Sequence, residues 1–218
     1  MRMLAQIPSV GRNYGCPGAM VRNDCPMSPV KRPKSAPRTA DTLLLCVDLQ
    51  PIFLNVLPDV GRLLRRCSFA IESARGLGLP MLFTEQVPAK LGRTSPDLLR
   101  LAAAKPEAMG KDTFSAFGDE HITRRLQEIG AEHLLICGIE TPVCVYQTAL
   151  AALRREYQVT LLTDCIGARR AEDATTALAA LDKSGCHLLS SETVFYSLLN
   201  DARHPFFRDY TSLVKKYG

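Results

Sequence analysis

The stretch Leu134-Leu135-Ile136-Cys137-Gly138-Ile139-Glu140-Thr141-Pro142-Val143-Cys144 decides the fold, because it predicts a buried strand, a tight turn and the start of a helix in direct succession. The apolar run 134–137 ends at a glycine, and the residues that follow favour a helix over 142–155. Thr141 is expected to be the N-cap of this helix, Pro142 its first residue and Cys144 its third.

The predicted position of Cys144 suits a nucleophile. Unpaired backbone N–H groups and the positive end of the helix dipole stabilise a thiolate in the first turn of a helix. We therefore expect the pKa of Cys144 to lie below that of a free cysteine. The alternative is that Cys144 is a small apolar core residue, which is the usual role of a buried free cysteine.

Apolar runs of strand length alternate with helical patterns on both sides of this stretch, from residue 41 onward. The expected strands are 43–47, 79–84, 107–111, 133–137, 158–162 and 186–190. The expected helices are 59–76, 119–129, 142–155, 170–183, 193–199 and 205–216. This alternation predicts an α/β fold, a single-domain, Rossmann-like three-layer α/β/α sandwich with a central, mainly parallel sheet of about six strands. Residues 85–97, punctuated by proline and glycine, are expected to form a long functional loop.

The first 40 residues differ in composition from the rest of the chain. They contain six of the 14 prolines and have no hydrophobic period, so we expect a disordered tail at 1–40 and one folded domain at 41–218. The arginine-rich tail resembles a transit peptide for a mitochondrion or another organelle, but its prolines disfavour the amphipathic helix of such peptides. A plain tail on a cytoplasmic protein is the other interpretation.

The net charge of +5 is concentrated in this tail. Residues 1–40 hold seven of the 27 basic residues and one of the 22 acidic residues, which leaves a net charge of −1 for the remainder. A nearly neutral domain has no electrostatic footprint for DNA or RNA. Apolar runs such as 43–47 and 149–153 are also too short to span a bilayer. We therefore expect neither nucleic acid nor membrane as a partner.

The eight cysteines indicate neither a zinc site nor a disulfide framework. None of them forms a Cys-x-x-Cys pair, and no histidine stands at ligand spacing from any of them. Cys46 and Cys137 interrupt apolar runs, where a cysteine is most simply a small hydrophobic residue. This usage is typical of a reducing compartment, in agreement with a cytoplasmic location.

Two more polar residues stand at predicted strand ends, where open parallel sheets bind their ligands. Asp48 closes the run 43–47, and partial desolvation there would raise its pKa and make it a usable base. Its alternative role is to cap the following turn. Lys111 ends the third predicted strand, where its ammonium would keep a carboxylate and a thiol charged. A lone lysine is otherwise usually exposed to solvent.

In this order and spacing, Asp48, Lys111 and Cys144 resemble the Asp-Lys-Cys triad of the isochorismatase-like cysteine hydrolase superfamily. The closest likeness is to its isochorismatase-domain-containing branch, and it runs from about residue 42 to the C-terminus. The motifs that carry it are Val-Asp-Leu-Gln at 47–50, Thr-Glu-Gln at 84–86, Leu-Gly-Arg-Thr at 91–94, Lys-Asp-Thr-Phe-Ser at 111–115, Gly-Ile-Glu at 138–140, Cys-Val-Tyr-Gln-Thr at 144–148 and His-Pro-Phe-Phe at 204–207.

The resemblance implies a reaction. Cys144 would attack a carbonyl carbon, Asp48 would take the thiol proton with Lys111 beside it, and water would hydrolyse the resulting thioester. It also implies a cis peptide bond between Ile139 and Glu140, with the backbone N–H groups of Glu140 and Cys144 directed at the oxyanion.

The residues expected to line the substrate pocket belong to strand-end loops or to the first turn of the cysteine helix. They are Gln50, Glu85, Gln86, Phe114 and Tyr146.

Two departures from relatives in the superfamily narrow the expected chemistry. Nicotinamidases bind a metal through histidines near the first two strands, whereas the four histidines of this chain lie in its second half, at 121, 133, 187 and 204. We therefore expect no metal and no other cofactor. True isochorismatases cleave a vinyl ether without needing the nucleophilic cysteine, so the presence of Cys144 favours carbonyl chemistry.

The sequence thus predicts a metal-independent cysteine hydrolase that acts on a small amide or a related acyl compound with a C–N bond. The alternatives are a catalytically idle oligomeric scaffold and a thiol redox sensor of the same fold. A homo-oligomer is expected from the resemblance.

Overall fold

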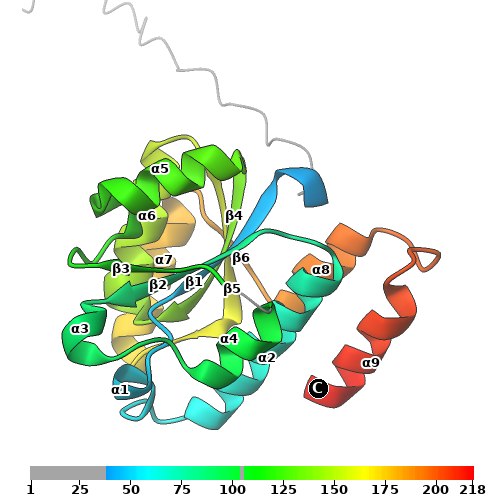
Figure 1. Cartoon of the computed structure of the whole chain (residues 1–218), viewed down its shortest axis with the longest axis horizontal. Coiled ribbons are helices and arrows are strands. Elements are labelled where there is room, and N and C mark those ends of the chain that lie inside the picture. The colour runs from blue at the N-terminus through cyan, green and yellow to red at the C-terminus, as the bar shows by residue number, and fades with distance from the viewer. Residues whose placement is uncertain (1–37, 104–105) are drawn as a thin grey trace, which may run out of the picture. The chain divides into compact units, whose positions relative to one another are not determined.

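The centre of the fold is a six-stranded sheet in which every neighbouring pair of strands is parallel. The computed structural model describes residues 38–103 and 106–218 (Figure 1). The strands are β1 (Thr42–Val47), β2 (Met81–Gln86), β3 (Ala108–Lys111), β4 (His133–Ile139), β5 (Gln158–Gly167) and β6 (His187–Leu189). Their order, β3-β2-β1-β4-β5-β6, is that of a doubly wound α/β fold. The predicted fold class is confirmed.

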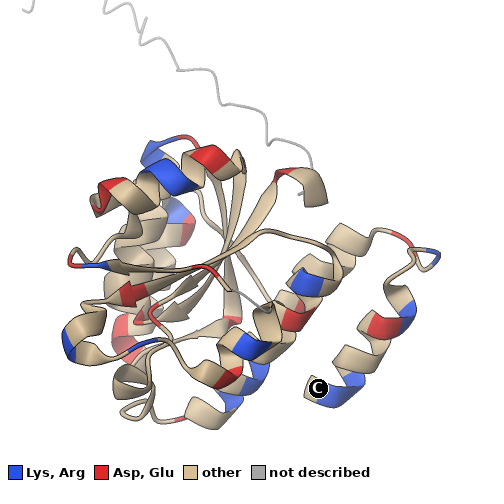
Figure 2. Ribbon diagram, in the orientation of Figure 1, with Lys and Arg blue, Asp and Glu red and all other residues tan. Residues whose placement is uncertain are grey.

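Helices connect the strands and cover both faces of the sheet. They are α1 (Pro51–Leu54), α2 (Val60–Gly76), α3 (Pro88–Leu91), α4 (Pro96–Ala102), α5 (Glu120–Ile129), α6 (Tyr146–Arg154), α7 (Ala171–Lys183), α8 (Ser191–Leu199) and α9 (Phe207–Tyr217). Short 3-10 turns lie at Thr39–Asp41 and Ala116–Gly118, and a π-helical turn lies at Thr141–Val145. Basic and acidic residues are interspersed on α2, α5 and α9 (Figure 2).

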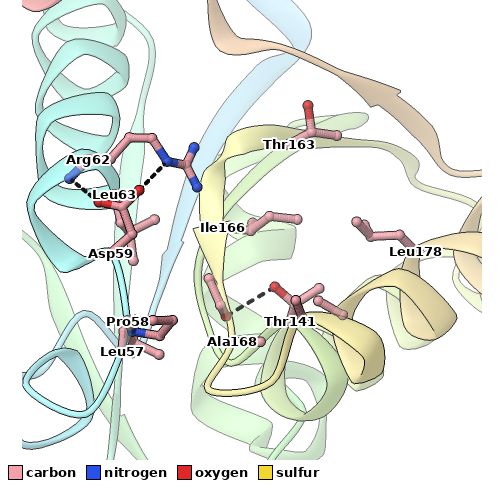
Figure 3. Close-up of a pocket in the computed structure, with 13 residues that line it drawn as sticks. Leu57, Pro58, Asp59, Arg62, Leu63, Thr141, Thr163, Ile166, Ala168 and Leu178 are labelled. Carbon is pink, nitrogen blue, oxygen red and sulfur yellow. Dashed lines mark hydrogen bonds and ion pairs between the residues drawn. The ribbon is translucent and has the colours of Figure 1, made fainter.

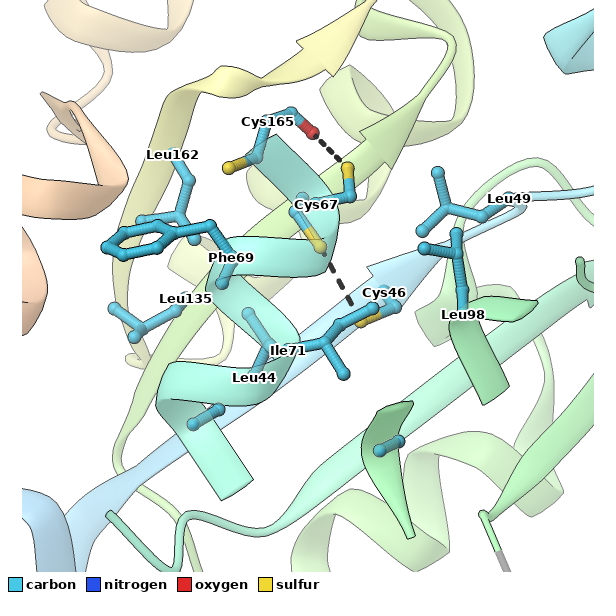
Figure 4. Close-up of a cluster of buried hydrophobic side chains, with 14 of the residues drawn as sticks. Leu44, Cys46, Leu49, Cys67, Phe69, Ile71, Leu98, Leu135, Leu162 and Cys165 are labelled. Carbon is cyan, nitrogen blue, oxygen red and sulfur yellow. Dashed lines mark hydrogen bonds between the residues drawn. The ribbon is translucent and has the colours of Figure 1, made fainter. Parts of the chain in front are cut away.

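Two buried clusters, one on each face of the sheet, join these layers. Helices α2, α4, α8 and α9 pack on one face, and α5, α6 and α7 pack on the other. Residues 43–47 of β1 enter the two clusters alternately, which explains why all five are apolar. Cys46 and Cys137 are fully buried in the first cluster, with their Sγ atoms 3.5 Å apart. Cys67 and Cys165 belong to the same cluster (Figure 4). Cys46 and Cys137 thus pack as small hydrophobic residues, as predicted.

Several strands end at residues other than those predicted, and the two that bear on the site are β2 and β5. β2 continues to Gln86, where Glu85 pairs with Gly110 and Gln86 with Lys111, so the predicted loop over 85–97 is wrong at its start. Helices α3 and α4 occupy much of the rest of that segment. β5 extends five residues beyond the expected end, to Gly167. The cause in both cases is hydrogen bonding to a neighbouring strand, which local sequence does not reveal.

Strands β1 and β4 lie side by side at the centre of the sheet, at the point where the strand order reverses. Ligands bind beyond the carboxyl ends of the strands at such a point. Gly138 has a φ of 117°, and a Cβ atom there would lie 2.0 Å from the carbonyl oxygen of Val47. Only glycine permits this close approach, which sets the exits of β1 and β4 next to each other.

Most of the predicted tail, residues 1–37, lies outside the described residues. The described part of the chain begins with the turn Thr39–Asp41, which leads directly into β1. No helix of the described segments combines the length and the apolar character needed to cross a membrane.

Candidate active site

Asp48 is the first residue beyond β1, and its side chain is held on both carboxylate oxygens. Oδ1 accepts a hydrogen bond of 2.8 Å from Thr84 Oγ1, and Oδ2 accepts one of 2.8 Å from Lys111 Nζ. The residue is 1% exposed and has a φ of 50°, a left-handed conformation that aspartate tolerates better than most residues. The N-cap of the following helix α1 is Gln50, so the alternative role for Asp48 as a cap is not realised.

Lys111 is the last residue of β3, and its ammonium has three acceptors within the protein. Nζ donates to Asp48 Oδ2 at 2.8 Å, to Gln86 Oε1 at 2.6 Å and to the Thr113 carbonyl at 3.1 Å. Its side chain is 0% exposed, so the solvent-exposed alternative is wrong. An ammonium has three N–H donors, and all three are occupied. Lys111 can therefore act on Asp48 by charge but has no donor left for a ligand.

Cys144 lies in the π-helical turn between β4 and α6 and is 8% exposed. Glu140, not Thr141, precedes this turn as its N-cap, so the predicted capping role of Thr141 is wrong. The Thr141 hydroxyl donates instead to the Gly167 carbonyl at 3.0 Å and ties the turn to the end of β5 (Figure 3). This long-range bond competes with the local capping interaction that the sequence suggests.

The segment that leads into the turn has the geometry implied by the family resemblance. The peptide bond between Ile139 and Glu140 is cis. The Glu140 carbonyl accepts hydrogen bonds from the backbone N–H groups of Val143, at 3.0 Å, and Val145, at 3.2 Å. The second bond closes a π-helical turn, a type of turn frequently found at functional sites.

The resting thiol of Cys144 is protonated. Burial raises the pKa of Cys144 to about 12, and the charge of the Asp48 carboxylate adds to this shift, while that of Lys111 opposes it. The predicted lowering of the pKa is therefore wrong, because desolvation of the thiolate outweighs the helix dipole. Any reaction of this thiol needs a base, and Asp48 is the carboxylate beside it.

Cys144 and Asp48 face one cavity of about 180 Å³. Its lining residues are Asp48, Phe53, Gln86, Phe114, Ile139, Glu140, Val143, Cys144 and Arg169. Ligand pockets are usually about 300–1,000 Å³, so this one suits a small molecule. Its walls are largely apolar, with the thiol and the carboxylate as reactive groups.

The structure divides the predicted lining residues into two groups. Gln86 and Phe114 line the cavity, whereas Gln50, Glu85 and Tyr146 do not. Gln50 binds the backbone of Gln86 on both sides, with Oε1 accepting from N at 2.6 Å and Nε2 donating to O at 3.0 Å.

The other two residues of the second group also support neighbouring segments. Glu85 Oε1 accepts from the Thr94 N–H at 2.8 Å, and Tyr146 packs against the apolar cluster on the α6 face. Gln50, Glu85 and Tyr146 thus belong to the framework of the site rather than to its wall.

Sequence reasoning missed three lining residues, Phe53, Val143 and Arg169. Arg169 follows the end of β5 by two residues, and its Nε lies 2.8 Å from Glu140 Oε1. The strand-exit rule that found Asp48 would also have found Arg169 if the end of β5 had been placed at Gly167. Phe53 lies in the short helix α1, for which the sequence has no helical period.

A second cavity, of about 250 Å³, lies between α2, β5 and α7 (Figure 3). Its charged residues, Asp59 and Arg62, form an ion pair with each other at 2.8 Å, and no cysteine, lysine or histidine lines it. We therefore place the reactive site at Cys144. In residues 38–103 and 106–218, no group of three or more His, Cys, Asp and Glu side chains is arranged to hold a metal ion.

Known proteins share this fold and sequence pattern. The family model described as "Isochorismatase domain" matches residues 42–193. Isochorismatase domain-containing protein 2 of Xenopus laevis is 31% identical over 189 residues, which cover 86% of this chain and 90% of that protein.

Two solved structures extend the similarity to three dimensions. The MAR1 ribonuclease of Caenorhabditis elegans superposes with a TM-score of 0.78 at 26% identity, covering 83% of this chain and 93% of that one. The YcaC gene product of Escherichia coli, an octameric hydrolase of unknown specificity, has a TM-score of 0.74 at 23% identity, covering 85% and 98%. The family-model match and the identity to the Xenopus protein show that the chain belongs to the isochorismatase family.

Proposed function

We propose that the chain is a metal-independent cysteine hydrolase that cleaves the C–N bond of a small amide or a related acyl compound. One observation carries this proposal. A protonated thiol and a buried carboxylate line the same small cavity, and a lysine with no free donor compensates the carboxylate. These are the parts that nucleophilic catalysis at a carbonyl requires.

The proposed reaction has two steps, formation of a thioester on Cys144 and its hydrolysis. The Cys144 thiol gives its proton to Asp48 as the sulfur attacks the amide carbon, and the carbonyl electrons move to the oxygen. When the tetrahedral intermediate collapses, the C–N bond breaks, and the nitrogen takes the proton from Asp48 and leaves as ammonia or an amine. Asp48 then accepts a proton from water as the water attacks the thioester carbon. When this second tetrahedral intermediate collapses, the C–S bond breaks, the sulfur takes the proton from Asp48, and the acid is released.

The oxyanion of each tetrahedral intermediate needs donors other than Lys111, whose three N–H groups are occupied. We assign this role to the backbone N–H groups of Glu140 and Cys144, at the start of the turn. Removing a single oxyanion donor typically costs about 3 kcal/mol in the transition state. In this scheme the Lys111 ammonium compensates the charge of the Asp48 carboxylate. The buried thiol is costly to ionise without a base, and this carboxylate is the base that takes its proton.

The alternative of a thiol redox sensor agrees less well with the site. Sensor cysteines are exposed and have low pKa values. Cys144 is 8% exposed, and its pKa is raised to about 12. A nucleic-acid substrate is also disfavoured, because the chain beyond residue 40 has a net charge of −1.

A screen for ammonia release from small aliphatic and aromatic amides tests the proposal. Cys144→Ala and Asp48→Asn should abolish turnover, and acid quenching during turnover should reveal a thioester on Cys144 by intact-mass spectrometry. Cys186→Ala is the matched control, because Cys186 is also buried with a pKa raised to about 12 but does not line the cavity. Turnover that survives in Cys144→Ala would contradict the mechanism. Absence of turnover on every amide would favour the idle scaffold.

We also propose that the chain works as a homo-oligomer, as the YcaC gene product does. Exposed apolar side chains support an interface. Phe114, which lines the cavity, is 54% exposed, and Ile52 and Val56, on either side of the lining residue Phe53 in the chain, are 49% and 57% exposed. Light scattering during size-exclusion chromatography would measure the assembly, and a monomer would rule it out.

A further inference from the structure

We infer that the site selects an uncharged amide with a compact apolar group, and that the Glu140 side chain sets this selectivity by neutralising Arg169. The inference rests on the proposed amide hydrolysis and names its substrate class. It comes from how the charges that line the cavity are paired.

Each carboxylate that lines the cavity is already bound to a cation. Asp48 is paired with Lys111 at 2.8 Å, and Glu140 is paired with Arg169 at 2.8 Å. The remaining lining residues carry no formal charge. A ligand in this cavity therefore meets two compensated pairs and no unpaired charge.

The two pairs differ in exposure, which makes one of them adjustable. The side chains of Lys111 and Asp48 are 0% and 2% exposed, whereas those of Arg169 and Glu140 are 60% and 14% exposed. The first pair belongs to the buried floor beside the thiol. The second pair lies nearer to solvent, where Arg169 could turn to an anionic ligand if Glu140 did not hold it.

The other walls favour an apolar substituent. Phe53, Phe114, Ile139 and Val143 provide aromatic and aliphatic surface around the thiol. A carboxylate or an ammonium placed against these side chains would lose water without gaining a partner, which is unfavourable. A substrate whose acyl group ends in a methyl or a small ring would lose little hydration energy on entering the cavity.

Three primary amides of similar length test the selectivity directly. Butyramide, succinamate and β-alaninamide end in a methyl, a carboxylate and an ammonium at neutral pH. The wild-type kcat/KM for butyramide should exceed that for each charged amide by about tenfold or more. A wild-type preference for either charged amide would overturn the inference.

Glu140→Gln releases Arg169 while retaining the backbone at the turn. The ratio of kcat/KM for succinamate to that for butyramide should then rise by up to about 5-fold, the worth of one ion pair made by a partly exposed arginine. Arg169→Gln leaves Glu140 without its cation and should shift the preference toward β-alaninamide instead.

The matched control is Asp201→Asn, which breaks the ion pair between Asp201 and Arg203. Neither of these residues lines the cavity, so the substrate ratios should stay unchanged. An equal shift in Asp201→Asn, or no shift in Glu140→Gln, would show that Glu140 does not set the selectivity.

Binding is measured separately from turnover by the protection of Cys144 against iodoacetamide. Protection by butyramide but not by the charged amides, with no ammonia released, would overturn the proposed reaction and leave the charge selectivity supported. Absence of both protection and turnover with all three amides would overturn the selectivity itself.

Discussion

Lys111 Nζ lies 2.8 Å from Asp48 Oδ2, and the two side chains are 0% and 2% exposed. Burying an ion pair costs desolvation energy that is often as large as the attraction between the two charges, so stability alone is a weak reason for such a pair. Its position beside a buried thiol provides a functional reason, since a base must stay charged there to accept the thiol proton.

Lys111→Met should lower the free energy of unfolding by about 3–5 kcal/mol, because it leaves the Asp48 carboxylate buried without its cation. Urea unfolding followed by circular dichroism measures this change. The double variant Asp48→Asn/Lys111→Met should be less destabilised than Lys111→Met, because no charge remains uncompensated. If the loss of unfolding free energy in the double variant equals the sum of the losses in Asp48→Asn and Lys111→Met, the two charges are not coupled.

Alkylation of Cys144 by iodoacetamide should accelerate by about tenfold per pH unit between pH 7 and 10, because its thiolate is scarce well below a pKa of about 12. Asp48→Asn removes one cause of the raised pKa and should speed labelling at pH 8 while abolishing turnover. Cys186 serves as the internal control in peptide mass spectrometry, and its labelling should not respond to that substitution. A labelling rate that levels off below pH 9 would contradict the raised pKa.

Gln86→Leu should reduce kcat more than it raises KM. Gln86 lines the cavity, but its Oε1 accepts from Lys111 Nζ at 2.6 Å and its Nε2 donates to the Asp112 carbonyl at 2.9 Å, so its amide is engaged within the protein. An unmade hydrogen bond to a buried charge should also lower the free energy of unfolding by about 1–3 kcal/mol. The same substitution at the exposed Gln147 is the control and should change stability by no more than about 0.5 kcal/mol. An increase in KM alone would identify Gln86 as a substrate-binding residue instead.

Acid should destabilise the protein through His133. Burial, with a smaller contribution from His187, lowers the pKa of His133 to about 4. Between about pH 6.5 and pH 4 the unfolded chain binds a proton at this residue and the folded chain does not, so stability falls as the pH falls. The loss should reach about 3 kcal/mol.

Urea unfolding at pH 7 and pH 4.5 measures this effect. His133→Leu should lose less stability over this interval than the wild type, and the same change at the exposed His121 should leave the pH dependence as it is. An unchanged pH dependence in His133→Leu would assign the acid sensitivity to other groups.

Local patterns were sufficient to predict most of the architecture. Residues 43–47 of β1 form a continuous apolar run because helices cover both faces of the sheet, and α5 has helical spacing followed by Gly130 with a φ of 71°. Both signals depend on neighbours in the chain, so the sequence displays them. Residues at strand exits, such as Asp48, could be identified for the same reason.

The properties that depend on distant segments could not be predicted in this way. The end of β5, and with it Arg169, follows from pairing with β4. The pKa of Cys144 follows from burial and from a carboxylate 96 positions earlier in the chain, and these outweigh the local helix dipole. Gln50, predicted to contact substrate, binds the backbone of Gln86. Local sequence thus determines which residues stand at the strand ends, whereas desolvation and long-range hydrogen bonds determine their protonation and their partners.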